Sequence, residues 1–249
     1  MVIATQIKEH LAAFDYGTIF TINDFDIESR YQATLVRALN RKVATGELQK
    51  VSKGKYYKPK KTVFGSLSPT PYEIVKDLLE KNGKIVGYIT GTSAFASMGL
   101  TTQITSVITI GKSRYHRPAT RGNTKISFLV QPNPITEENI PLLLILDAIK
   151  LIQEITATLP DDSVAVLGEI ISVLPKERIQ SLCQLAEAYK PRTRALLGVI
   201  LENNNLPTFG LEMTLNGVTT YKLYISEKAL PNKKNGTSYE ITRKQWVIC

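Results

Sequence analysis

The chain has 249 residues and a net charge of +9, with 43% hydrophobic and 21% charged residues. This composition is typical of a globular protein and excludes an intrinsically disordered one. No apolar run approaches 18 residues, so no membrane-spanning helix is expected, and two cysteines with two histidines make neither a disulfide framework nor a zinc site. The N-terminus lacks an apolar signal core, so we expect a cytoplasmic protein.

The charge is unevenly distributed along the chain. Residues 1–62 and 63–130 each carry a net charge of +5, residues 131–205 carry −4 and residues 206–249 carry +3. A basic front followed by an acidic block suggests an anionic partner for one part of the chain and a different partner for another.

The first 46 residues predict two helices separated by a short extended segment. A short amphipathic helix is expected over 6–14, an extended segment over 19–22, and a turn or short helix near Asn23. The clearest helix of the chain follows, with Ser29 and Gln32 as a capping box and Gly46 just past its end. At 100° per residue its basic stripe contains Arg30, Thr34, Arg37 and Arg41, and its apolar stripe contains Tyr31, Leu35, Ala38 and Leu39.

A basic β-hairpin is predicted directly after this helix. Residues 48–57 alternate around a turn at 52–55, and Pro59 ends the second strand. Helix, short element, basic helix and hairpin is the order of a winged helix-turn-helix, whose second helix enters the major groove of DNA. Residues 28–61 hold ten Lys and Arg against two Glu, an arrangement that duplex DNA favours through counterion release.

The sequence therefore predicts a winged helix-turn-helix that binds double-stranded DNA over residues 1–61, with charge that serves only solubility as the alternative. The candidate DNA contacts are Arg30, Thr34, Arg37, Arg41, Lys42, Lys50, Lys53, Lys55 and Lys58.

Four segments of the sequence resemble one known protein family. They are "LVRALNRKVATGELQKVSKGKYYKPKKTVFG", "GYITGTSAFASMGLTTQI", "NPITEENIPLLLILDAI" and "TLNGVTTYKLYISEKALPN". Together they are similar to the AbiEi-type antitoxins of bacterial type IV toxin–antitoxin systems, which act in abortive infection. The resemblance extends over nearly the whole chain.

This resemblance implies two activities. The N-terminal winged helix-turn-helix would repress transcription of the protein's own operon. The larger C-terminal part, residues 62–249, would counteract a cognate nucleotidyltransferase-like toxin, without necessarily forming a stable complex with it.

The region 62–130 is predicted to be mixed α/β. A proline-containing linker leads to a helix over 71–81, followed by strands over 84–91, 106–112 and 125–130 and a short helix after 91. A candidate second basic patch precedes the last of these strands and comprises Lys112, Arg114, Arg117 and Arg121. A solvated loop is the favoured interpretation, because loops collect charge, and a contact to flanking DNA or to an RNA is the alternative.

The acidic block 136–204 predicts four helices, over 141–152, 161–174, 175–189 and 191–204. Cys183 lies beside Leu182 and Leu185 and is interpreted as a core residue. The tail 211–249 predicts strands, with a hairpin at Asn216-Gly217 and a loop at 233–236. The predicted fold class is thus α+β: an N-terminal winged helix-turn-helix followed by a larger mixed α/β domain with a helical block.

Enzyme chemistry is not predicted. The sequence has no glycine-rich phosphate loop, no nucleophile elbow and no carboxylates at metal spacing, so no catalytic residue, cofactor or metal is expected. Two function classes remain: a DNA-binding autorepressor that is also an antitoxin, and a repressor whose C-terminal domain binds a small effector. The downstream gene would distinguish them.

Overall fold

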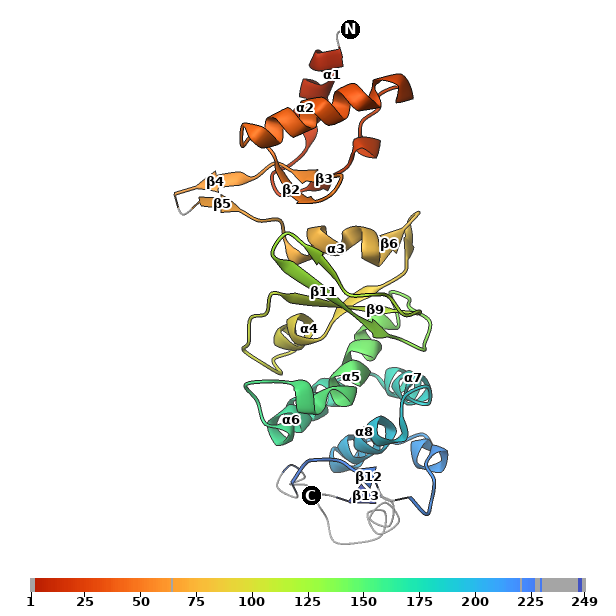
Figure 1. Cartoon of the computed structure of the whole chain (residues 1–249). Coiled ribbons are helices and arrows are strands. Elements are labelled where there is room, and N and C mark those ends of the chain that lie inside the picture. Colours follow the sequence, from red (N-terminus) through yellow and green to blue (C-terminus); the bar gives the residue numbers. More distant parts are fainter. Residues whose placement is uncertain (1–2, 64, 220, 227–228, 230–245, 248–249) are drawn as a thin grey trace. The chain divides into compact units, whose positions relative to one another are not determined.

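A computed structural model describes residues 3–63, 65–219, 221–226, 229 and 246–247 of the chain (Figure 1). The chain divides into two compact units, Met1–Leu78 with Pro118–Ile126 and Leu79–Arg117 with Ser127–Cys249. Helices and small sheets occur in both units, so the predicted α+β class is confirmed. None of the helices among the described residues has the length and apolar character to cross a bilayer.

The first unit begins with the connectivity of a winged helix-turn-helix. Its elements are α1 (Ile3–Ala13), β1 (Ile19–Phe20), η1 (Ile22–Asp24), η2 (Ser29–Tyr31), α2 (Gln32–Ala44), β2 (Gln49–Ser52) and β3 (Lys55–Tyr57). Strand β3 pairs antiparallel with both β1 and β2, so Tyr56 lies opposite Phe20 on one side and Lys50 on the other. The predicted order of helix, short element, basic helix and hairpin is confirmed.

The core of this unit lies between the helices and the three-stranded sheet. Leu35 and Leu39 of α2 are 1% and 0% exposed. They pack in one cluster with Ile7, Leu11, Phe20, Phe25, Leu48 and Tyr56. Full burial of a leucine side chain contributes about 1.5–3 kcal/mol, so the apolar stripe of α2 fixes which way its basic stripe faces.

The ends of α2 agree with the prediction at one end only. Gly46 follows the helix with φ of 73°, as expected of a residue that must adopt left-handed geometry. The prediction of a capping box at Ser29 was wrong, because Ser29 lies inside the 3-10 turn η2 and α2 begins at Gln32. Tyr31 precedes α2 without any side-chain capping bond.

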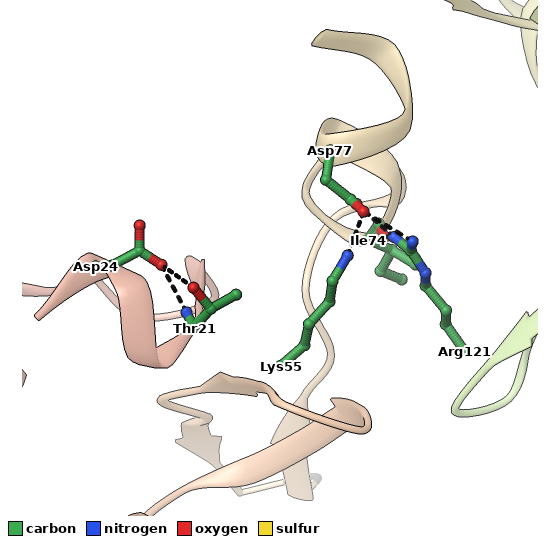
Figure 2. Close-up of polar contacts among 6 residues, drawn as sticks. All are labelled: Thr21, Asp24, Lys55, Ile74, Asp77 and Arg121. Atoms are coloured by element: carbon green, nitrogen blue, oxygen red, sulfur yellow. Dashed lines mark hydrogen bonds and ion pairs between the residues drawn. The ribbon is translucent and has the colours of Figure 1, made fainter. Parts of the chain in front are cut away.

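The turn between β1 and α2 is closed by its own side chains (Figure 2). The Oδ2 atom of Asp24 accepts hydrogen bonds from the backbone N–H and the hydroxyl of Thr21, at 2.6 and 2.9 Å. The Thr21 hydroxyl oxygen in turn accepts from the Asn23 N–H at 3.2 Å. This capping box was not predicted, and it fixes η1 between the first strand and the basic helix.

The first unit extends beyond the predicted domain 1–61. Its further elements are β4 (Lys60–Thr62), β5 (Gly65–Leu67), α3 (Pro71–Leu79), β10 (Ala119–Arg121) and the start of β11 (Thr124–Val130). Strands β4 and β5 form a hairpin that projects from the winged helix, where a linker had been expected (Figure 1). Glu73 of α3 accepts the Ile19 N–H of edge strand β1 at 3.1 Å, so α3 is tied to the sheet.

The strands of the second unit are shorter than predicted. They are β6 (Glu80–Lys81), β7 (Lys84–Ile85), β8 (Tyr88–Thr90) and β9 (Val107–Lys112), and α4 (Thr92–Ser97) follows β8. Strands β6 and β7 form a hairpin around Asn82-Gly83, which ends α3 at Leu79, earlier than expected. The single strand predicted over 84–91 is therefore divided into β7 and β8. The larger sheet has the strand order β10-β11-β9-β8.

The helical block matches the prediction closely. Its elements are α5 (Ile140–Lys150), η3 (Ile152–Glu154), α6 (Pro160–Ser172), α7 (Lys176–Ala186) and α8 (Pro191–Asn203). Helix α8 is buried from Ala195 to Leu201 and packs against α5, α6 and α7. Cys183 is buried in the same core, and burial raises its pKa to about 12. Its interpretation as a core residue is confirmed.

A buried polar network joins strand β8 to the helices. Asp147 of α5 is fully buried and accepts hydrogen bonds from the hydroxyls of Tyr88, Thr90 and Tyr189, at 2.7, 2.9 and 2.9 Å. The side-chain amide of Gln131 donates to both tyrosine hydroxyls, at 2.8 and 2.6 Å. Gly111 is required beside this network, because a Cβ there would lie 2.3 Å from the Tyr88 ring.

The tail differs from the prediction. Residues around Asn216-Gly217 do not form a hairpin, because η4 (Leu211–Thr214) is a 3-10 turn that buries Leu211 and is followed by the buried Leu215. Strand β12 (Tyr221–Lys222) instead pairs parallel with β13 (Trp246–Val247). The predicted loop 233–236 and most of the predicted last strand lie outside the described residues.

Candidate nucleic-acid interface

The exposed side of α2 presents the predicted basic stripe. Thr34, Arg37 and Arg41 are exposed, while Leu35 and Leu39 on the opposite side are buried. Neither Arg37 nor Arg41 makes an ion pair with any residue that the structure describes. Their guanidinium groups are therefore available to an external acceptor.

Arg30 differs from Arg37 and Arg41 because it is ion paired within the chain. It belongs to η2 rather than α2, and its Nε atom lies 2.8 Å from a carboxylate oxygen of Glu28. Its guanidinium carbon lies 4.8 Å from the centre of the Tyr31 ring. Since both ion-pair partners are 67% exposed, this pair is weak, and an external phosphate can compete with Glu28 for Arg30.

The hairpin β2–β3 presents two of its lysines to solvent. Lys53 is exposed at the turn, where Gly54 adopts φ of 76°. Lys50 is also exposed, and its Nζ atom lies 5.5 Å from the centre of the Tyr56 ring. Tyr56 and Tyr57 are buried, so they pack within the unit rather than offering a surface for bases.

Lys55 is held by α3 (Figure 2). Its ammonium group forms an ion pair with Asp77, and Arg121 binds the same carboxylate through two hydrogen bonds of 2.6 and 2.9 Å. Arg121 also donates to the Ile74 carbonyl at 2.5 Å. Burial raises the pKa of Asp77, but the hydrogen bonds and charges of Arg121 and Lys55 outweigh burial and hold this pKa below its ordinary value.

Two other predicted DNA contacts, Lys42 and Lys58, also have partners inside the first unit. Lys42 forms an ion pair with Glu47 at 2.5 Å. The Lys58 ammonium donates to the Phe14 carbonyl at 2.9 Å. The sequence alone did not indicate these partners of Lys42, Lys55 and Lys58, because each partner comes close to its lysine only when the chain folds.

The candidate second basic patch does not form as a set of four exposed cations. Lys112 is 7% exposed and donates to the Val86 carbonyl at 3.0 Å, and Arg121 binds Asp77 in the first unit. Arg114 and Arg117 are exposed in the second unit. The expectation was wrong for Lys112 because β9 carries its side chain into the interior.

Two lysines that sequence reasoning left out complete the basic surface of the first unit. Lys60 and Lys61 are exposed on β4, at the end of the predicted domain 1–61. Their signal was present in the run "KPKK", but the hairpin that positions them was not predicted. Among the described residues, no three His, Cys, Asp or Glu side chains lie close enough together to hold a metal ion.

The sequence matches the model of one protein family. A family model described as "Family of unknown function (DUF6088)" matches residues 6–182, which is more than half of the chain. The chain belongs to the DUF6088 family. The match spans the winged helix and reaches into α7, so DUF6088 membership concerns both units.

A solved structure shares the fold of this DUF6088 protein. The crystal structure of the RV2827C protein from Mycobacterium tuberculosis aligns with a TM-score of 0.62 and 13% sequence identity. The alignment covers 98% of this chain and 90% of that one. At this identity the likeness shows the fold alone. No curated protein matches the sequence.

Proposed function

We propose that this DUF6088 protein is a DNA-binding transcriptional autorepressor and an antitoxin. The observation that carries the DNA-binding half is the exposed side of α2, where Arg37 and Arg41 are free of ion pairs among the described residues. In a winged helix-turn-helix this helix enters the major groove, where arginine reads guanine edges. The wing lysines Lys50 and Lys53 then lie against phosphates.

The number of free cations sets the salt dependence of this binding. Residues 28–61 contain ten Lys and Arg. Arg30, Lys42 and Lys55 are ion paired, and Lys58 donates to a backbone carbonyl. The remaining six are Arg37, Arg41, Lys50, Lys53, Lys60 and Lys61, each without an ion pair to any described residue.

We expect duplex DNA binding by the full chain to weaken steeply with salt. If the six free cations each neutralise one phosphate, a plot of log affinity against log salt concentration has a slope of about −5. A titration of promoter DNA at several salt concentrations measures this slope. A slope near zero would refute DNA binding, whereas a slope of about −9 would mean that the other four cations, Arg30, Lys42, Lys55 and Lys58, also reach phosphates.

The antitoxin half rests on the resemblance to AbiEi-type antitoxins. In this proposal residues 62–249 counteract a cognate nucleotidyltransferase-like toxin, with or without direct binding, and the protein performs no catalysis of its own. A downstream gene for a nucleotidyltransferase-like protein favours this function. A downstream metabolic or transport operon favours the alternative, a winged-helix repressor whose C-terminal domain binds a small effector.

We expect toxin neutralisation to be independent of DNA binding. A full chain that carries both Arg37→Ala and Arg41→Ala should still rescue growth when the cognate toxin is induced, because these arginines lie in the first unit. Growth is measured with the toxin induced, in cells that carry the variant, the unchanged protein or an empty vector. Loss of rescue by a variant that is still folded would show that neutralisation acts through DNA.

A further inference from the structure

Four lysines of the first unit line one hollow of about 570 Å³. This lysine pocket is formed by Leu11, Tyr16, Lys42, Glu47, Leu48, Lys58, Pro59, Lys60 and Lys61. Glu47 is the one carboxylate of the lining, so the pocket carries a net charge of +3. We propose that it binds a free nucleotide, with the phosphates on the lysines and the base against Tyr16.

The lysines form the phosphate-binding side of the pocket. The carboxylate of Glu47 compensates one of them, Lys42, and this hydrogen bond and charge hold the pKa of Glu47 below its ordinary value. Lys60 and Lys61 are exposed and make no ion pair with a described residue. Lys58 uses one N–H on the Phe14 carbonyl, which leaves two of its three donors for a ligand. Glu47 also interacts electrostatically with Lys61, but four lysines against one carboxylate leave an excess of three positive charges, and ammonium groups bind phosphate strongly.

The other side of the pocket suits a nucleobase. Tyr16 is 63% exposed, and the Lys58 ammonium lies over one face of its ring, so a base would stack on the other face. The Lys58 ammonium lies 5.0 Å from the centre of that ring, so the aromatic and cationic sides of the pocket adjoin. Leu11 and Leu48 are 7% and 3% exposed and provide an apolar floor. Stacking of a base on an aromatic side chain contributes about 1–3 kcal/mol and tolerates any base.

The lysine pocket is separate from the arginine stripe of α2. Lys42 follows Arg41, and one step along a helix turns the side chain by about 100°. The Lys42 ammonium reaches Glu47, beyond the end of the helix, rather than joining Arg37 and Arg41. The volume falls within the range of about 300–1,000 Å³ that is usual for small-molecule sites. A free nucleotide is therefore the ligand that fits; it would share Lys60 and Lys61 with the proposed phosphate contacts to DNA, but not Arg37 and Arg41 of α2.

The test is calorimetric titration of the DNA-free full chain with ADP and, separately, with inorganic pyrophosphate. We expect both ligands to bind at one site per chain. The double variant Lys60→Gln with Lys61→Gln should weaken both by about tenfold or more, because it removes two charge-assisted contacts. Tyr16→Ala should weaken ADP but leave pyrophosphate unchanged. The matched control is Lys76→Gln with Lys125→Gln, which removes two exposed cations of the same unit outside the pocket.

Three results would overturn the proposal. The first is no heat of binding for ADP at about 1 mM. The second is equal weakening by the pocket variant and the control variant, which would mean that the overall charge of the unit attracts the ligand. The third is equal weakening of ADP and pyrophosphate by Tyr16→Ala, which would remove the base from the site. Because no DNA is present, each of these results leaves the DNA-binding proposal untouched.

Discussion

Replacing Arg37 and Arg41 together by alanine should weaken binding to the operator by about 100-fold or more. A bidentate contact between an arginine and a base contributes about 1–3 kcal/mol, and each 1.4 kcal/mol is a factor of ten in affinity. Both residues are exposed on α2 and free of ion pairs among the described residues, so no internal partner limits this loss. Fluorescence anisotropy with operator and random duplexes measures it, and a promoter reporter should show derepression.

The wing gives the contrasting variant. Lys53→Ala should weaken operator and random DNA about equally, because phosphate contacts carry no sequence information. A double variant, Lys76→Ala with Lys125→Ala, removes as many charges as the Arg37 and Arg41 double variant, from exposed positions on α3 and β11, and should bind the operator almost normally. A wing variant that changes sequence preference, beside a helix variant that does not, would contradict the assignment of α2 to the major groove.

Asp147→Ala should lower the free energy of unfolding of the second unit by about 3–5 kcal/mol. The reason is that three buried hydroxyls, of Tyr88, Thr90 and Tyr189, donate to this one carboxylate. Alanine would leave all three without their acceptor in a fully buried site. Urea unfolding followed by circular dichroism measures the loss.

Asp147→Asn keeps the shape and separates charge from hydrogen bonding. Burial raises the pKa of Asp147, and the hydrogen bonds from Tyr88, Thr90 and Tyr189 oppose this only in part. A carboxyl whose pKa is higher in the folded than in the unfolded chain contributes stability at low pH that is lost as the pH rises toward the folded-state pKa. The asparagine variant does not titrate.

We therefore expect Asp147→Asn to become more stable relative to the unchanged chain as the pH rises from about 4 to about 7. Paired urea titrations across this range measure the difference. A difference that stays constant with pH would mean that Asp147 titrates alike in the folded and unfolded chains.

The sequence was informative where local periodicity determines the structure. The two stripes of α2 follow from residue spacing alone, because Leu35 and Leu39 must be buried together and Arg37 and Arg41 then face outward. The helices of the acidic block were predicted for the same reason. Gly46 and Gly54 were expected in turns because they tolerate positive φ.

The parts that were missed depend on residues far apart in the sequence. Lys55 appeared to be a free wing lysine because nothing near it in sequence indicates Asp77 or Arg121, which reach it only in the folded chain. Asn216-Gly217 is a strong hairpin signal, but Leu211 and Leu215 are buried by the helical core and the flanking strand does not form. The lysine pocket and the place of Tyr16 in it could not be predicted, because the β4–β5 hairpin that positions Lys60 and Lys61 was not predicted.

The first unit is assembled from two separate stretches of chain, residues up to Leu78 and the segment Pro118–Ile126. During synthesis on the ribosome the winged helix emerges first, but Asp77 lacks Arg121 until the β10–β11 hairpin has been translated. Strands of the second unit are made in between. The ion-paired group of Lys55, Asp77 and Arg121 is therefore completed only after part of the second unit has been made, when about half of the chain exists.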